Sequence, residues 1–380
     1  MNNFIFHNPT RLLFGEGMIA QLSKEIPADK RIMITFGGGS AKTNGVYEQV
    51  MKALEGRNII EFWGIESNPE IETLKKAIAI GKEKKIDYLL AVGGGSVIDG
   101  TKLIAAGLLY EGDAWDLVIK GETKETIPMG TVLTLPATGS EMNNGAVISR
   151  KSTQEKYPFF SNYPIFSILD PSVTFSLPAH QVACGIADTF VHVMEQYMTT
   201  PGQSRLMDRW AESILTMLIN IAPLIKENQQ DYDLMSQFMM GATMGLNGFI
   251  GMGVTQDWAT HMIGHELTAI HGLTHGATLA IVYPGTLRTL SEKKHEKMLQ
   301  YAQRIWGITT GIPDIRINQA IEKTEEFFRS LGLSTRLGEE NIGDDTILEI
   351  ERRFNERHAA YGEDGDVTGA VAKAILMNCK

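Results

Sequence analysis

Four of the nine histidines lie within one stretch, DWATHMIGHELTAIHGLTHG at residues 257–276. His261 and His265 are four residues apart, as are His271 and His275. Residues at this spacing share one face of a helix, and Gly272 allows the chain to end one helix and begin the next. Such a cluster of imidazole nitrogens is typical of a metal site.

A matching carboxylate lies upstream, in GIADTFVHVMEQY. Asp188 and His192 are also four residues apart, so both side chains can reach a single ion from one rigid helix. One carboxylate with three imidazoles suits Fe²⁺ or Zn²⁺ better than Mg²⁺ or Ca²⁺, which prefer oxygen ligands. The spacing alone leaves open which histidines bind the ion.

The two cysteines are far apart, and one of them precedes Asp188 by four residues. Cys184 and Cys379 form neither a disulfide framework nor a zinc knuckle, which favours a reducing cytoplasm. Cys184 has two interpretations: a small buried hydrophobic residue, or a thiol beside the metal that binds soft ions or makes the protein sensitive to oxidation.

Glycine runs end two of the expected strands, in the tetrapeptide GGGS at residues 37–40 and 93–96. Glycines between a parallel strand and a helix let a phosphate approach the backbone N–H groups. Neither run fits G-x-G-x-x-G, and GSVIDGTK lacks the Lys-Ser/Thr order of a P-loop. No carboxylate follows the first run to repel a 2′-phosphate, so the expected cofactor is NADP(H).

The pattern of apolar residues differs between the two halves of the chain, which indicates two domains. Short apolar runs predict strands at 31–37, 59–64, 87–95, 130–140 and 165–171, alternating with helices at 44–56, 69–84 and 97–109. From Pro178 onward, long helix-periodic segments predict helices at 178–200, 204–226, 231–250, 255–271, 274–290, 292–306, 315–331, 344–357 and 366–377. We therefore expect an α/β dinucleotide-binding domain with a mostly parallel sheet at residues 1–178. An all-helical metal-binding domain follows at 179–380, with the active site in the interdomain cleft.

Charge and hydropathy exclude two classes of partner. The net charge is −10 and no dense Lys/Arg block occurs, which argues against nucleic-acid binding. The N-terminus has no signal-peptide pattern, and no apolar run is long enough to span a bilayer.

The chain resembles the iron-containing alcohol dehydrogenase family, and most closely its NADPH-dependent butanol dehydrogenase and aldehyde reductase branch. The motifs that carry the resemblance are FIFHNPTRLLFG, GGGSVIDGTK, LPATGSE, AVISRK, ADTFVHVMEQY and the histidine-rich stretch. The resemblance implies hydride transfer between NADP(H) and a small aliphatic aldehyde or primary alcohol. It also implies a homodimer, in which FIFHNPT would form an edge strand that pairs with a second copy of the chain.

The resemblance implies a role for particular residues. The metal ligands would be Asp188, His192, His261 and His275, and His265 and His271 would be the candidate proton relays. Cofactor-contacting positions would be Gly37, Gly38, Ser40, Gly94, Gly95, Ser96, Asp99, Thr138, Ser140, Asn143 and Lys156.

Two groups of alternatives stay open at this stage. The same architecture resembles glycerol or polyol dehydrogenase and dehydroquinate synthase, although no basic cluster near the histidines suits a phosphorylated, carboxylated substrate. A metal-dependent hydrolase or a non-catalytic metal-binding protein would explain the histidines but not the glycine runs.

Overall fold

The computed structural model describes residues 1–199 and 204–380. Its Cα positions form two compact units, each assembled from separate segments of the chain. The sheet unit comprises residues 7–178 and 229–247, and the helical unit comprises residues 1–6, 179–228 and 248–380. The contiguous domain limits 1–178 and 179–380 stay a prediction.

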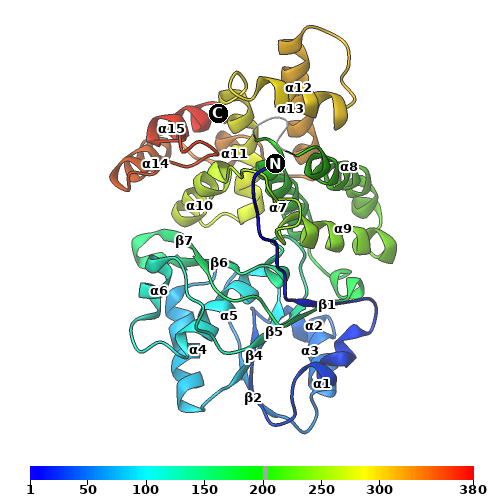
Figure 1. The fold of residues 1–380 in the computed structure, drawn as a ribbon, viewed down its shortest axis with the longest axis vertical. Helices are drawn as coiled ribbons and strands as arrows, with labels where there is room; N and C mark the ends of the chain where they lie inside the picture. Colours follow the sequence, from blue (N-terminus) through cyan, green and yellow to red (C-terminus); the bar gives the residue numbers. More distant parts are fainter. Residues whose placement is uncertain (200–203) are drawn as a thin grey trace. The chain divides into compact units, whose positions relative to one another are not determined.

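The sheet unit is built on a six-stranded sheet (Figure 1). Its strand order is β1-β8-β5-β4-β2-β3, and every pair is parallel. The strands are β1 (Arg11–Phe14), β2 (Arg31–Phe36), β3 (Asn58–Phe62), β4 (Tyr88–Gly93), β5 (Met129–Leu133) and β8 (Phe166–Leu169). A separate antiparallel hairpin joins β6 (Gly145–Arg150) to β7 (Glu155–Phe160). The predicted mostly parallel sheet is confirmed.

Helices cover both faces of this sheet because its strands are apolar on both sides. Along β2, Ile32 and Ile34 belong to one core cluster and Met33 to the other. The helices are α1 (Leu22–Glu25), α2 (Ser40–Thr43), α3 (Val46–Ala53), α4 (Ile71–Glu83), α5 (Gly95–Gly107), α6 (Ala114–Lys120) and α9 (Tyr232–Gly245). Residues of α1 and α3 pack in the first cluster, and those of α4, α5 and α6 in the second.

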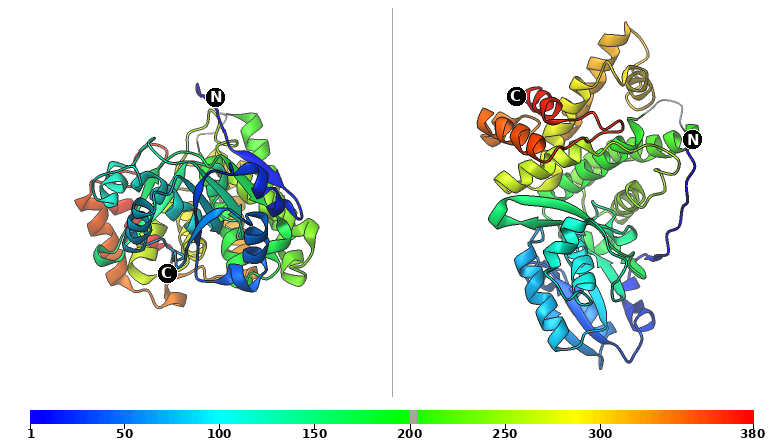
Figure 2. Two further views of the ribbon diagram at one scale, coloured as in Figure 1. Left: turned by 90° about the horizontal axis from the view of Figure 1, so that it is seen from below. Right: turned by 60° about the vertical axis from the view of Figure 1, so that its left-hand side comes forward.

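The helical unit follows the predicted series of long helices (Figures 1 and 2), except that the helix predicted at 231–250 forms α9 of the sheet unit. They are α7 (Ala179–Tyr197), α8 (Arg205–Glu227), α10 (Ala259–His271), α11 (His275–Thr289), α12 (His295–Arg304), α13 (Pro313–Ser330), α14 (Asp344–Glu356) and α15 (Gly369–Met377). Among the described residues, no helix has the length and apolar character needed to cross a membrane.

A glycine sets the spacing of the two helices that carry the metal-site candidates. A Cβ at Gly276 would lie 2.1 Å from the carbonyl oxygen of Cys184. Any larger residue would therefore force α11 away from α7. This close approach places the first turn of α11, which begins at His275, next to Cys184 in the N-terminal half of α7.

Candidate active site

Three imidazoles converge on one carboxylate oxygen in the helical unit. The Nε2 atoms of His192, His261 and His275 lie 3.5, 3.6 and 3.9 Å from Oδ1 of Asp188. Donor atoms of Asp188, His261 and His275 all lie within 4.8 Å of one another. The i,i+4 pairing on α7 and the turn between α10 and α11 thus bring together residues that are far apart in sequence.

The cluster is buried and its rings are in contact. The rings of His192 and His261 stack with centroids 4.5 Å apart, and the His265 ring lies 4.9 Å from that of His275. Asp188, His192, His261 and His265 are buried, and His275 is partly exposed. The structure therefore brings the predicted relay His265 into the same cluster as the predicted ligands.

The electrostatics of the cluster favour a positive charge. Burial alone would lower the pKa of His261, but the carboxylates of Glu195 and Asp188 outweigh it and raise this pKa to about 9. Two buried carboxylates beside one imidazole therefore stabilise a cation there, either a proton or a metal ion.

A divalent metal fits these residues. Nε2 of His261 is buried and has no hydrogen-bond partner among the described residues, since its distance to Asp188 is too long for a hydrogen bond. A metal ion would satisfy a buried ring nitrogen that faces a carboxylate without a hydrogen bond to it. The nitrogen and oxygen donors suit Fe²⁺ or Zn²⁺ alike.

Glu195 and Trp258 are neighbours of the cluster, and Glu195 was not singled out from the sequence. Oε2 of Glu195 accepts a hydrogen bond from Nδ1 of His261. Trp258 precedes α10 in the left-handed backbone conformation, with φ of 64°, which is a genuine outlier for a bulky residue. Its indole ring lies 5.4 Å from the His261 ring. Glu195 follows Asp188 by seven residues, a spacing of two helical turns that could have revealed it.

The remaining two candidates of this region lie in different surroundings. His271, at the end of α10, is exposed, and its Nε2 lies 2.9 Å from Oγ1 of Thr346 on α14. Its role as a proton relay stays a prediction. Cys184 is buried, and burial raises the pKa of its thiol to about 12. The interpretation as a small buried residue is therefore favoured, because a neutral thiol is a poor nucleophile and metal ligand.

In the sheet unit, the three cofactor motifs follow neighbouring parallel strands. Phe36 of β2 pairs with Val92 of β4, and Gly93 pairs with Leu133 of β5. The loops at 37–40, 94–96 and 134–140 consequently leave the same edge of the sheet. This is the edge at which open parallel sheets bind nucleotides.

The glycine runs permit close approaches at this edge. A Cβ at Gly95 would lie 2.2 Å from Oγ1 of Thr138, so glycine is required for the two loops to meet. By contrast, a Cβ at Gly38 would have no heavy atom within 4 Å. Gly37 and Gly38 follow β2, and Ser40 begins the short helix α2.

A fully buried lysine that the sequence did not predict joins α5 to the segment of residues 140–145. Nζ of Lys102 on α5 donates to Oγ of Ser140, Oδ1 of Asn143 and the carbonyl oxygen of Gly145, at 2.7, 3.1 and 2.6 Å. Ser140 in turn donates to Oδ1 of Asp99 at 2.5 Å. Burial lowers the pKa of Lys102 to about 8 and raises that of Asp99. Asp99, Ser140 and Asn143 therefore hold one another through a buried polar network.

The last two cofactor candidates contact the loop that follows β3. Nζ of Lys156 on β7 donates to Oδ1 of Asn68 at 3.0 Å. Oγ of Ser96 donates to the carbonyl oxygen of Ser67. The cofactor role of all these positions stays a prediction.

Comparison with known proteins places this geometry in a family. The family model described as iron-containing alcohol dehydrogenase matches residues 9–171, and the model of the C-terminal domain of that family matches residues 182–362. The chain is 50% identical to the NADPH-dependent aldehyde reductase YqhD of Escherichia coli, and the match covers 99% of each chain.

Solved structures agree with the sequence matches. A crystal structure of Escherichia coli YqhD superposes with a TM-score of 0.98 at 48% identity, covering 100% of this chain and 99% of the other. The NADH-dependent butanol dehydrogenase A of Thermotoga maritima has a TM-score of 0.93 at 34% identity, with coverage of 100% and 99%. The chain belongs to the iron-containing alcohol dehydrogenase family.

Proposed function

We propose that the chain is a metal-dependent aldehyde reductase and alcohol dehydrogenase that uses NADP(H) and acts on small aliphatic aldehydes and primary alcohols. The observation that carries the proposal is the convergence of His192, His261 and His275 on one oxygen of the buried Asp188. The printed activity of the YqhD relative, NADPH-dependent aldehyde reduction, supports it.

Asp188, His192, His261 and His275 would hold the ion, which is Fe²⁺ or Zn²⁺. When bound, the ion supplies Lewis-acid polarisation of the carbonyl group, and NADPH supplies the hydride. Asp188 offsets part of the positive charge, while the buried rings keep the site free of bulk water. His265 lies in ring contact with His275, where it can hold the proton that the product oxygen takes up.

The preference for NADP(H) over NAD(H) rests on the loop after β2. Gly37, Gly38 and Ser40 bring no carboxylate to the position where an acidic side chain would repel a 2′-phosphate. Relatives carry names with either cofactor, since the Thermotoga maritima protein is named as NADH-dependent. The absence of a carboxylate from this loop supports the assignment of NADP(H).

Localisation and assembly are part of the proposal. Cys184 and Cys379 are both free thiols, as expected of a protein of the reducing cytoplasm. A homodimer is supported by the N-terminal segment, where Phe4, Ile5 and Phe6 are exposed, Ile5 to 98%. β1, which follows this segment, is an edge strand of the sheet.

The test is NADPH oxidation with butyraldehyde by protein stripped with a chelator and reconstituted separately with Fe²⁺ and Zn²⁺. We expect turnover to return only with metal, to be much slower with NADH, and to be slower with glycerol in the reverse direction. If NADPH binds but neither ion restores aldehyde turnover, the polyol dehydrogenase or lyase alternative replaces this proposal.

A further inference from the structure

Glu195 lies on the same face of α7 as two of the candidate metal ligands. It follows Asp188 by seven residues and His192 by three, so the three side chains form one stripe along the helix. The side chain of Glu195 is only 2% exposed. A carboxylate buried this deeply needs strong partners to remain charged.

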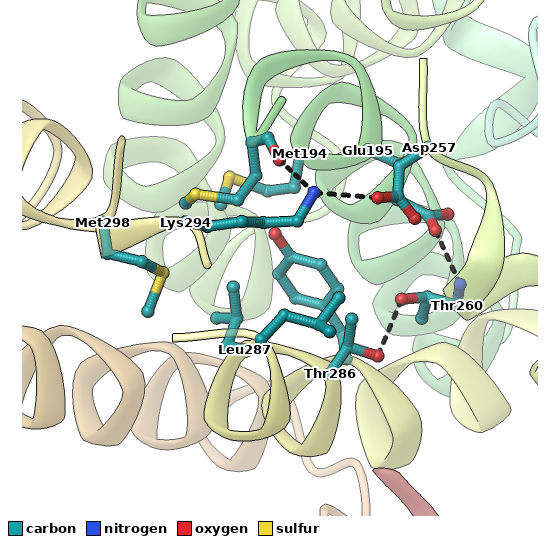
Figure 3. A pocket seen from close by; sticks show the side chains of 11 residues that line it. Met194, Glu195, Asp257, Thr260, Thr286, Leu287, Lys294 and Met298 are labelled. Carbon is teal, nitrogen blue, oxygen red and sulfur yellow. Dashed lines mark hydrogen bonds and ion pairs between the residues drawn. The ribbon is translucent and has the colours of Figure 1, made fainter. Parts of the chain in front are cut away.

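Three contacts join Glu195 to the start of α10, and Figure 3 shows its side chain beside Thr260. Oε1 accepts a hydrogen bond from the backbone N–H of Thr260 at 2.7 Å. Oε2 contacts Nδ1 of His261. The backbone oxygen of Glu195 accepts from the N–H of Asp257 at 2.9 Å. Both carboxylate oxygens are thus engaged by the first turn of α10, which carries His261.

The contact at Nδ1 determines which nitrogen of His261 remains for a metal. A carboxylate accepts a hydrogen bond, so Nδ1 carries a proton, and Nε2 is the nitrogen whose lone pair is available to a metal when the imidazole is neutral. Nε2 is the atom that lies 3.6 Å from Oδ1 of Asp188. We infer that Glu195 is a positioning residue that fixes the ring orientation and tautomer of His261 for metal binding. The inference rests on the proposed metal centre.

The surroundings of Glu195 leave its carboxylate little room to move. It borders a small cavity with room for about one water molecule. The residues that line the cavity also include Tyr283, Leu287 and Met298. The nearby ammonium group of Lys294 is held by Asp257 at 2.8 Å (Figure 3). It also donates to the carbonyl oxygen of Met198 at 2.7 Å.

This arrangement differs from an ordinary buried ion pair. A carboxylate that only stabilised the fold would affect the folding free energy without changing the metal affinity. A carboxylate that orients a ligand changes the metal affinity directly, and loss of such a partner commonly weakens metal binding about 10- to 100-fold. The distinction can be measured in the folded protein without turnover.

The test compares Glu195→Gln with Glu212→Gln in the full-length protein. Glu212 is the matched control because it is another buried carboxylate of the helical unit, paired with Arg304 at 2.8 Å. Zn²⁺ affinity is measured by competition with a chromophoric chelator, and NADPH affinity by fluorescence. We expect Glu195→Gln to weaken Zn²⁺ binding about 10- to 100-fold and leave NADPH affinity unchanged. Glu212→Gln should leave both affinities unchanged.

A second measurement applies even if Glu195→Gln does not fold. In Zn²⁺-loaded wild-type protein, ¹⁵N NMR of the imidazoles should show His261 protonated at Nδ1 and coordinated through Nε2. Coordination through Nδ1, or Zn²⁺ affinity of Glu195→Gln within twofold of wild type, would overturn the inference. Failure of the wild-type protein to bind any divalent ion would instead overturn the proposed function.

Discussion

Replacing Lys102 by methionine should destabilise the sheet unit and weaken NADPH binding. The ammonium group is fully buried and donates three hydrogen bonds within the network of Asp99, Ser140 and Asn143. Removing one member of a buried charged network costs about 3–5 kcal/mol. Methionine has nearly the same volume, so it adds no cavity.

For Lys102→Met, the expected loss of folding free energy lies at the low end of this range. The pKa of Lys102 is lowered from 10.5 to about 8 because burial disfavours its charged form, and the substitution recovers part of that desolvation penalty. A loss of about 3 kcal/mol corresponds to a decrease in Tm of roughly 6–12 °C for a domain of this size. NADPH affinity should fall as well, since the loop of residues 138–145 loses its anchor.

The assay is thermal unfolding followed by circular dichroism, together with NADPH titration. Lys76→Met provides the control, because Lys76 lies exposed on α4, where substitutions cost within about 0.5 kcal/mol. Zn²⁺ affinity should be unaffected in both variants. A Tm within 2 °C of wild type and unchanged NADPH affinity for Lys102→Met would refute the assigned role of the network.

Three further predictions follow from burial and charge. Burial raises the pKa of Tyr88 and Tyr197 above the ordinary value of 10, so the unfolded chain loses these protons first. The contribution of these two tyrosines to stability should therefore be constant below pH 10 and fall above it, and two of the ten tyrosines should ionise only together with unfolding; full ionisation of all ten in the folded protein, followed by absorbance, would contradict this. Gly38→Asp has space for its side chain, and its charge should weaken NADPH binding by at least about tenfold, or about 1.4 kcal/mol, while NADH binding changes less. Equal effects on the two cofactors in titrations would count against the assigned position of the 2′-phosphate. Burial raises the thiol pKa of Cys184 and Cys379 to about 12, so neither should react with a thiol reagent at pH 8 until the protein is denatured; rapid labelling of the native protein would show otherwise.

Hydrophobic periodicity was sufficient to predict most of the elements. The segment predicted as a helix at 178–200 forms α7 at Ala179–Tyr197, and the strand predicted at 31–37 forms β2 at Arg31–Phe36. β1 and the hairpin of β6 and β7 were not predicted. β1 has only four residues, and β7 contains a proline and charged residues, which weaken a strand signal.

In the candidate site, too, contacts within one helix could be predicted from the sequence, whereas contacts between distant segments could not. Spacing on a helix was enough to group Asp188 with His192, because residues four apart share a face. The contact of Glu195 with His261 joins residues 66 positions apart, and no local pattern specifies such a pair. Lys102 was missed for another reason: a lysine is almost never fully buried, so nothing in GGGSVIDGTK suggested that its side chain would turn inward.

The central claim is that the Asp188 cluster holds the ion that aldehyde reduction requires, while the glycine loops bind NADPH independently. The most direct test is Asp188→Asn, assayed for Zn²⁺ and Fe²⁺ content, for NADPH binding, and for NADPH oxidation with butyraldehyde. We expect bound metal and turnover to be lost together while NADPH affinity stays within twofold of wild type. Turnover that persists in the metal-free variant would contradict the account.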